Sequence, residues 1–140
     1  MGKVQILAVL TMDGCLSSEL YDKAHQDLCL DRCGLDEIRK KAFYRVTPDY
    51  SISMLHEWRK DCTNIRYLAE ATPDTADYIN GLLRMHAVDE IILYTVPFIS
   101  GSGRHFFKSA LPEQHWTLSS LKSYPNGVRR IIYILDKKAR

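Results

Sequence analysis

The sequence predicts one layered α/β domain built on a mostly parallel sheet. Helix-like and strand-like segments alternate along its 140 residues without repeats or low-complexity linkers, which is the pattern of a sheet covered by helices. Residues 65–71, 74–87 and 90–96 have the patterns of a strand, a helix and a strand, and this order predicts a parallel crossover connection. With 46% hydrophobic residues the chain can bury one core, so we expect a single domain over residues 1–140.

The first half of the chain predicts one strand and three helices. The strand covers about residues 4–11, and a helix follows that Ser17 or Ser18 can cap and that Gly34 ends. In the second helix, Glu37 and Lys41 are spaced for an ion pair. The apolar positions of the second and third helices are Leu35, Ile38 and Ala42, and Met54, Leu55, Trp58 and Cys62.

The crossover helix has clear start and packing signals. Thr72 is expected as its N-cap, with Pro73 at the first helical position and Asp74 in the first turn. Asn80 and Arg84 fall on the face opposite the apolar stripe. The stripe consists of Ala76, Ile79, Leu82, Leu83 and Ala87.

A buried strand followed by a glycine-rich corner is the most specific feature of the sequence. Ile91 to Val96 form a short apolar and β-branched run, which is typical of a strand covered on both faces. Pro97 ends this strand because it has no N–H for a central ladder. Residues 101–103, Gly-Ser-Gly, then allow a sharp turn, after which Phe106 and Phe107 are expected to re-enter the core.

This stretch resembles the D-E-strand-P-x-x-x-G-x-G-x-x-x-F signature of the dihydrofolate reductase-like family, in particular the reductase domain of bacterial riboflavin-biosynthesis deaminase-reductases. The N-terminal VQILAVLTMDGCLSS is similar to the family's opening strand, with its Thr-x-Asp-Gly turn at residues 11–14. The tail WTLSSLKSYPNGVRRIIYIL is similar to its closing hairpin. The resemblance implies a three-layer fold with a mostly parallel central sheet and an antiparallel hairpin at residues 115–135. The middle is shortened, since only about fifty residues separate Gly14 from Ile65.

The resemblance also implies a function, namely an NADPH-dependent reductase of a small heterocycle, either a riboflavin-pathway aminopyrimidine or a pterin. Asp22 or Asp27 could deliver the proton, and no local motif decides between them. Each site residue also has a simpler interpretation, because Asp-Gly is an ordinary turn dipeptide and a threonine suits a strand through its β-branch. The implied site residues are Asp13 for catalysis, Val9, Glu70, Ala71, Thr72 and Thr75 for the cofactor, and Thr95 for the substrate.

The chain departs from the family at the expected cofactor site. Ala71 and Thr72 replace a glycine pair that lets a pyrophosphate approach the helix N-terminus. Asp74 adds a carboxylate that would repel the pyrophosphate. The alternative hypothesis is therefore a non-catalytic, dimeric binding or interaction protein that keeps the scaffold with a degraded cofactor site.

Composition narrows the partners and the compartment. The net charge of +2 is small and scattered, so no nucleic-acid partner is expected. No apolar stretch reaches the roughly 20 residues that a membrane-spanning helix needs, so no membrane partner is expected. The four cysteines lack dense disulfide spacing and no apolar leader precedes them, which favours the cytoplasm.

Two further expectations concern metal binding and association. His25, Cys29 and Cys33 could share one helix face, but no fourth ligand is placed to complete a zinc site, so we expect no metal. Without a metal, Cys29 and Cys33 are expected to be buried thiols beside a surface histidine, His25. A shortened sheet leaves an edge or an apolar face uncovered, and pairing with a second copy to form a homodimer is the common remedy.

Overall fold

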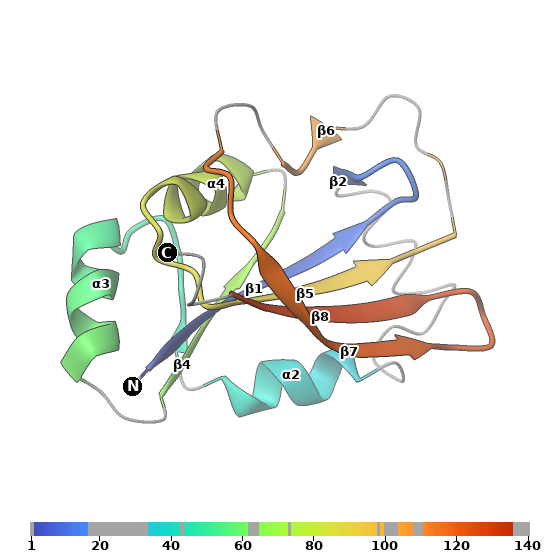
Figure 1. Cartoon of the computed structure of the whole chain (residues 1–140), viewed down its shortest axis with the longest axis horizontal. Coiled ribbons are helices and arrows are strands. Elements are labelled where there is room, and N and C mark those ends of the chain that lie inside the picture. The colour runs from blue at the N-terminus through green and yellow to red at the C-terminus, as the bar shows by residue number, and fades with distance from the viewer. Residues whose placement is uncertain are drawn as a thin grey trace.

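The computed structural model describes residues 2–16, 34–42, 44–61, 65–72, 74–97, 99, 104–107 and 111–135. Within these residues, a six-stranded sheet has the order β3-β4-β1-β5-β8-β7, with α4 on one face and α2 on the other (Figure 1). A small sheet pairs β2 with β6. The elements are β1 Lys3–Leu10, β2 Cys15–Leu16, α2 Leu35–Lys41, β3 Tyr44–Arg45, α3 Ile52–Asp61, β4 Arg66–Glu70, α4 Ala76–Arg84, β5 Glu90–Thr95, β6 Arg104–His105, β7 Trp116–Ser123 and β8 Arg129–Leu135.

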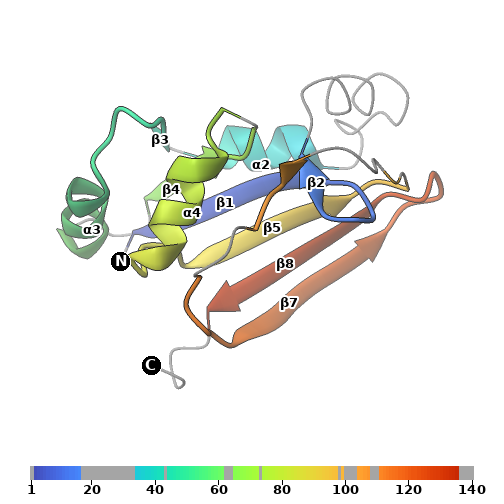
Figure 2. The ribbon, with the colours of Figure 1, turned by 90° about the horizontal axis from the view of Figure 1, so that it is seen from above.

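The predicted fold class and crossover are confirmed. Strands β4 and β5 both run parallel to β1, which lies between them, and β3 runs parallel to β4. Strands β8 and β7 complete the sheet as an antiparallel hairpin beside β5. The parallel part of the sheet thus lies between two layers of helix, whereas on the α4 face no described helix covers β7 and β8 (Figure 2).

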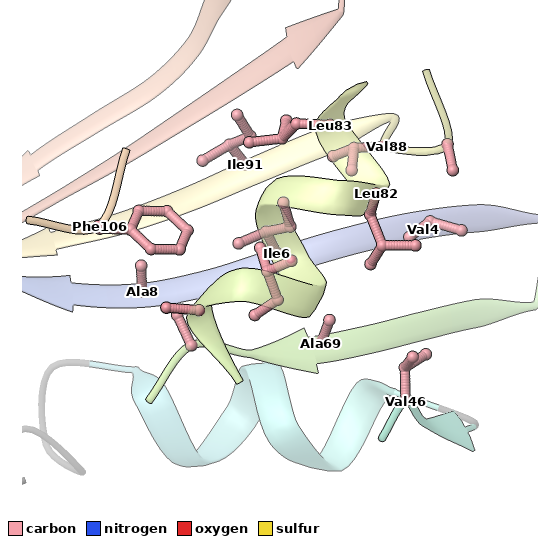
Figure 3. Packing of buried hydrophobic residues seen from close by; sticks show 14 of the residues in the cluster. Val4, Ile6, Ala8, Val46, Ala69, Leu82, Leu83, Val88, Ile91 and Phe106 are labelled. Carbon is pink, nitrogen blue, oxygen red and sulfur yellow. The ribbon is translucent and has the colours of Figure 1, made fainter. Parts of the chain in front are cut away.

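Strand β1 separates two hydrophobic clusters because its side chains alternate between the two faces. Val4, Ile6 and Ala8 join the larger cluster under α4, where Leu82 and Phe106 also lie (Figure 3). Leu7 and Val9 join the smaller cluster on the other face, with Ile38 and Ala42 of the α2 region packed against it. A central strand that is buried on both faces accounts for the continuous apolar run in its sequence.

The β3 end of the sheet is covered by aromatic side chains around α3. Tyr67 of β4 stacks on Tyr44 of β3, with ring centroids 5.5 Å apart, and on Trp58 of α3 at 6.3 Å. Trp58 meets Tyr50 edge to face at 5.6 Å. The Tyr78 hydroxyl of α4 donates to the Tyr50 carbonyl oxygen at 2.6 Å, and burial raises the pKa of that phenol. These contacts join α3 and α4 to the β3 edge.

The hairpin turn explains the Pro-Asn-Gly sequence at residues 125–127. Gly127 has a φ of 90°, a backbone conformation that side chains disfavour. An added Cβ there would meet Pro97 Cγ at 3.1 Å. The Gly127 N–H donates to the Tyr124 carbonyl oxygen at 3.0 Å. Glycine is therefore needed both for the turn and for its contact with the end of β5.

Three local predictions are wrong. Helix α4 begins later than expected, because Thr75 rather than Thr72 is the residue that precedes its first turn. Asn80 is not on an outward face but is fully buried. Phe106 is buried as predicted, whereas Phe107 is 44% exposed.

Several predicted features lie outside the described residues. They include the first helix after Ser17 or Ser18, the candidate proton donors Asp22 and Asp27, and the glycine corner at residues 101–103. His25, Cys29 and Cys33 are outside them too. In the second helix, Glu37 and Lys41 are both described but form no ion pair with each other. No helix in the described parts of the chain is long and apolar enough to cross a membrane.

The buried Asn80 amide joins α4 to the segment that carries β6. Its Nδ2 donates to the Ala76 carbonyl oxygen at 2.8 Å and to the Phe106 carbonyl oxygen at 2.7 Å. We predict that Asn80→Ala lowers the free energy of unfolding by about 1–3 kcal/mol, because it leaves a buried carbonyl without its donor.

Urea denaturation checks this prediction, with Asp77→Glu as the control. Asp77 is exposed on the same helix, and its change should shift stability by less than about 0.5 kcal/mol. Equal midpoints for the two variants would contradict the role assigned to Asn80.

Candidate functional site

The carboxyl ends of β1 and β4 form a topological switch point. After β1 and the short β2, the next described helix along the chain is α2, on one face of the sheet, whereas the chain leaving β4 enters α4 on the other face (Figure 1). In open α/β sheets, ligands bind outside the carboxyl ends of the strands where neighbouring connections diverge in this way. The predicted site residues all lie at the carboxyl ends of β1, β4 and β5 or in the turns that follow.

The turn after β1 is held by the hydroxyl group of Thr11, which is 2% exposed. Thr11 Oγ1 donates to the Asp13 carboxylate and accepts a hydrogen bond from the Cys15 N–H at 3.0 Å. Gly14 closes the turn with a φ of 77°, and its N–H donates to the Thr11 carbonyl oxygen at 3.0 Å. The Asp13 carboxylate is thus oriented at the end of β1 and remains partly accessible.

Strand β6 lies beside this turn. Pairing of β2 with β6 places His105 opposite Cys15, with His105 Nδ1 3.9 Å from Cys15 Sγ. The Phe106 N–H donates to the Gly14 carbonyl oxygen at 3.1 Å. Through its bond to Asn80, the β6 segment therefore links the Asp13 turn to α4.

The loop from β4 to α4 satisfies its polar groups internally. Thr75 Oγ1 donates to the Glu70 carbonyl oxygen at 2.9 Å and accepts a hydrogen bond from the Thr72 N–H at 2.9 Å. The Thr75 N–H donates to the Thr72 carbonyl oxygen at 3.1 Å. The Ala71 side chain is not directed toward this loop but packs in the core under α4, where it is 1% exposed. Of the two replaced glycines, only Thr72 therefore adds a side chain to the loop.

The Glu70 carboxylate is held by two arginines that are distant in sequence. Arg39 of α2 forms a salt bridge with its Oε1, and Arg45 Nη2 of β3 lies 3.9 Å from its Oε2. These three residues place two positive charges and one negative charge beside the loop. The sequence alone showed no basic residue near residues 70–75, because both arginines approach through the fold.

Charge at the start of α4 opposes an anion. Asp74 and Asp77 are both exposed there, and Asp77 lies in the first turn. Two carboxylates near the positive end of the helix dipole reduce its attraction for a phosphate group. Among the described residues, no group of three or more His, Cys, Asp or Glu side chains is arranged to hold a metal ion.

The two remaining predicted residues, Val9 and Thr95, lie near the carboxyl ends of β1 and β5, which pair with each other. Thr95 pairs with Leu10 on one side and with Arg129 on the other, so their three side chains share one face of the sheet. Leu10 belongs to the cluster under α4, which identifies that face. Val9 is 6% exposed and packs on the opposite face, so only its backbone is available at the β1 end.

Sequence reasoning missed four residues that organise this edge: Thr11, Arg39, Arg45 and Arg129. Thr11 was visible only as part of a turn motif. The arginines come from segments outside the motifs, and no local pattern connects them with Glu70 or Thr95. Their place depends on strand order and register, which the sequence does not state.

Comparison with solved structures identifies the fold. A protein from Shewanella sp. PV-4 assigned to riboflavin biosynthesis superposes with a TM-score of 0.63 at 11% identity, covering 96% of this chain and 99% of that one. The diaminohydroxyphosphoribosylaminopyrimidine deaminase/5-amino-6-(5-phosphoribosylamino)uracil reductase of Thermotoga maritima gives 0.56 at 9% identity, with 96% of this chain covered. The riboflavin biosynthesis reductase of Saccharomyces cerevisiae gives 0.50 at 15%, covering 97% of this chain and 89% of that one. This chain has the dihydrofolate reductase-like fold.

The fold likeness is not accompanied by a close sequence relative. No protein-family model matches the sequence, and no curated protein matches it significantly. The chain spans 56% of the bifunctional Thermotoga maritima enzyme. The predicted resemblance is therefore confirmed at the level of fold, with reductases among the structural neighbours.

Proposed function

We propose that this protein is an NADPH-dependent reductase of a small heterocycle, of the riboflavin-pathway aminopyrimidine or pterin type. The observation that carries the proposal is the switch point at the carboxyl ends of β1 and β4, where Asp13, Glu70 and Thr72 lie on adjoining chain segments. Solved structures of the same fold include proteins named as reductases, which supports this reaction class. We further propose that this reductase is a cytoplasmic enzyme that acts on a soluble metabolite.

The residues at this edge suit the nicotinamide end of the cofactor better than its pyrophosphate. The end of β1 offers backbone and the oriented Asp13 carboxylate, and Thr95 lies at the end of the neighbouring β5, an arrangement suited to a nicotinamide ring and a heterocycle. At the start of α4, the Thr72 N–H is already bonded and Asp74 is exposed, so a pyrophosphate has fewer donors. Arg39 and Arg45 supply positive charge on the other side of the loop.

In the proposed mechanism the bound cofactor supplies a hydride, and the protein orients the substrate and handles a proton. The Asp13 carboxylate would exchange that proton with a ring nitrogen, while Thr11 keeps it oriented through its hydroxyl. Thr95 would contact the heterocycle, and Arg129 beside it is suited to an anionic substituent. Val9, Ala71, Thr72 and Thr75 would line the cofactor through backbone and hydroxyl groups.

We predict that Asp13→Asn reduces turnover by about 10²–10⁴-fold, the usual contribution of a positioned acid or base. Affinity for NADPH should remain within about twofold, because the amide keeps an acceptor for Thr11. Loss of NADPH absorbance with 5-amino-6-(5-phosphoribosylamino)uracil-derived and dihydropterin substrates measures turnover, and calorimetry measures affinity. Asp49→Asn, at an exposed turn before α3, is the control. A wild-type protein that turns over none of these substrates would contradict the proposal.

A second candidate is a non-catalytic binding protein on the same scaffold. The internally bonded Thr72–Thr75 loop and the exposed Asp74 and Asp77 favour it, because both weaken a pyrophosphate site. The substitution Ala71→Gly is a poor test, since the Ala71 methyl packs in the core rather than in the loop. Removing the exposed carboxylates of Asp74 and Asp77 tests whether their charge weakens the pyrophosphate site, without disturbing packing.

For this candidate we predict that Asp74→Asn combined with Asp77→Asn strengthens NADPH binding. Each removed like charge is worth about 0.3–1 kcal/mol near a helix end, so the pair should give a roughly threefold to thirtyfold gain. Titration calorimetry at low salt measures it, with Asp49→Asn again as the matched charge control. Tight binding by the wild type would exclude this candidate, and unchanged affinity in the double variant would show that the two carboxylates do not weaken the site.

We also propose that the protein forms a homodimer through the β7–β8 side of the sheet. Strand β7 is an eight-residue edge, and Leu118 and Leu121 on it are 52% and 57% exposed. Their cross-strand partners Tyr133 and Ile131 share the same face, which the described helices leave uncovered (Figure 2). A second copy fits because antiparallel pairing of one strand with its own copy about a two-fold axis satisfies both edges at once.

We predict that Leu118→Lys combined with Leu121→Lys converts a dimer at micromolar concentration into a monomer, since two charges would be buried opposite two like charges. Analytical ultracentrifugation distinguishes a 16.1 kDa monomer from twice that mass. Met54→Lys on α3, where Met54 is 45% exposed, is the control and should leave the dimer intact. A wild-type monomer throughout the micromolar range would contradict the proposed interface.

A further inference from the structure

A cavity of about 200 Å³ lies between α2 and the sheet, away from the switch point. One water needs only ~10–15 Å³ measured in this way, so the cavity can hold a small organic molecule. The amino-terminal parts of β1, β4 and β5 contribute Gln5, Arg66 and Glu90 to its lining.

Gln5 is an unusual residue for this position. It lies in the middle of the sheet on β1, is 5% exposed, and is surrounded in its strand by apolar side chains. No described residue forms a hydrogen bond with its side-chain amide, which lines the cavity. Because the amide atoms keep some accessible surface, a ligand or water in the cavity can bond to them.

Arg130 supplies a guanidinium group to the lining of the cavity. Its Nε is buried, and no hydrogen-bond partner reaches it. One of its Nη atoms lies 3.1 Å from the position of a Cβ added at Gly34, so the guanidinium sits against the start of α2. The guanidinium group of an arginine that lines a cavity is suited to a carboxylate, which accepts two parallel hydrogen bonds.

The cavity carries charges of both signs that do not neutralise each other. Lys41, Arg66 and Arg130 are cationic, and Glu37 and Glu90 are anionic. In the described structure none of these five side chains forms an ion pair. Opposite charges that surround one cavity without pairing can each pair with a ligand instead.

The apolar part of the lining defines the rest of the ligand. Ile92 of β5 and Ile132 of β8 are directly paired neighbours, so they form one patch of the floor, and Ile38 of α2 lies opposite. Gln5 and Glu90 are likewise paired across β1 and β5, which places an amide beside a carboxylate. A positively charged amino group would be bound there, and an alkyl group would cover the isoleucines.

We propose that this cavity binds a small zwitterion with an apolar side chain, that is, a free apolar amino acid. Its carboxylate pairs with Arg130 and the neighbouring cations, its ammonium group pairs with Glu90 and the Gln5 amide oxygen, and its side chain contacts the three isoleucines. The site is separate from the proposed reductase site, because the paired Gln5 and Glu90 lie toward the amino ends of the strands whose carboxyl ends form the switch point.

Titration calorimetry with the purified full chain tests the proposal without NADPH or substrate. The probes are the apolar amino acids L-valine, L-leucine, L-isoleucine, L-methionine and L-phenylalanine. For the tightest of them, two relatives that lack one charge are compared; for leucine these are 4-methylpentanoate and 3-methylbutylamine. We expect saturable one-to-one binding of at least one amino acid at millimolar concentration or below, and at least tenfold weaker binding of both relatives.

Variants locate the binding to the cavity. Arg130→Gln and Glu90→Gln should each weaken the amino acid at least tenfold, and Arg130→Gln should leave 3-methylbutylamine unaffected. Arg129→Gln is the matched control for Arg130→Gln, because the adjacent residue on β8 faces the other side of the sheet. Lys41→Gln changes an exposed residue of α2 and supplies a lining variant that folds even if the β-sheet variants do not.

The outcomes separate the proposal from its alternatives. Failure of all five amino acids to bind at millimolar concentration would overturn the proposal, and the cavity would then hold water. Equal binding by the one-charge relatives would overturn the zwitterion, and unchanged affinity in Arg130→Gln, Glu90→Gln and Lys41→Gln would place the ligand elsewhere. None of these results depends on the reductase, whose test uses different ligands and Asp13.

Discussion

The burial of β1 on both faces is the constraint on which the rest of the structure depends. All of its residues from Val4 to Leu10 are buried, and the apolar ones alternate between two hydrophobic clusters. Its neighbours are fixed to it at both ends: the Val4 N–H donates to the Asp89 carboxylate at 2.9 Å, and the Leu10 carbonyl oxygen accepts from Val96 at 2.9 Å. Because two strands take their register from β1, their carboxyl ends arrive at one edge together.

That register accounts for the composition of the candidate site. The Ala71 N–H donates to the Leu7 carbonyl oxygen at 2.7 Å, which fixes where β4 ends and the α4 loop begins. The loop then closes on itself through Thr75, and Glu70 is left to bind arginines from the opposite layer. The same edge therefore has an accessible Asp13 carboxylate that could transfer a proton, and a helix N-terminus at α4 whose carboxylates repel an anion. This contrast is why two functional candidates remain physically reasonable.

The sequence predicts this fold well where local chemistry and global packing agree. The apolar run of β5 requires a central strand, and the Pro-Asn-Gly turn requires the hairpin, because Gly127 has a positive φ and contacts Pro97. Prediction fails where a partner comes from afar. Asn80 looks like an outward polar residue until Phe106, 26 residues away, supplies its acceptor. The α4 start moved from Thr72 to Thr75 because the Thr75 hydroxyl bonds to the Glu70 carbonyl oxygen.

The same reasoning applies to Gln5, whose place in an apolar strand made it easy to overlook in the sequence. Burying an amide without a partner costs about 1–3 kcal/mol by mutational measures, and apolar side chains of similar size would avoid that cost. In this position the amide lies beside Glu90 and lines a cavity with Arg130. An amide that has no hydrogen-bond partner in the sheet and lines a cavity with charged side chains is better explained by a ligand in that cavity than by a defect of packing.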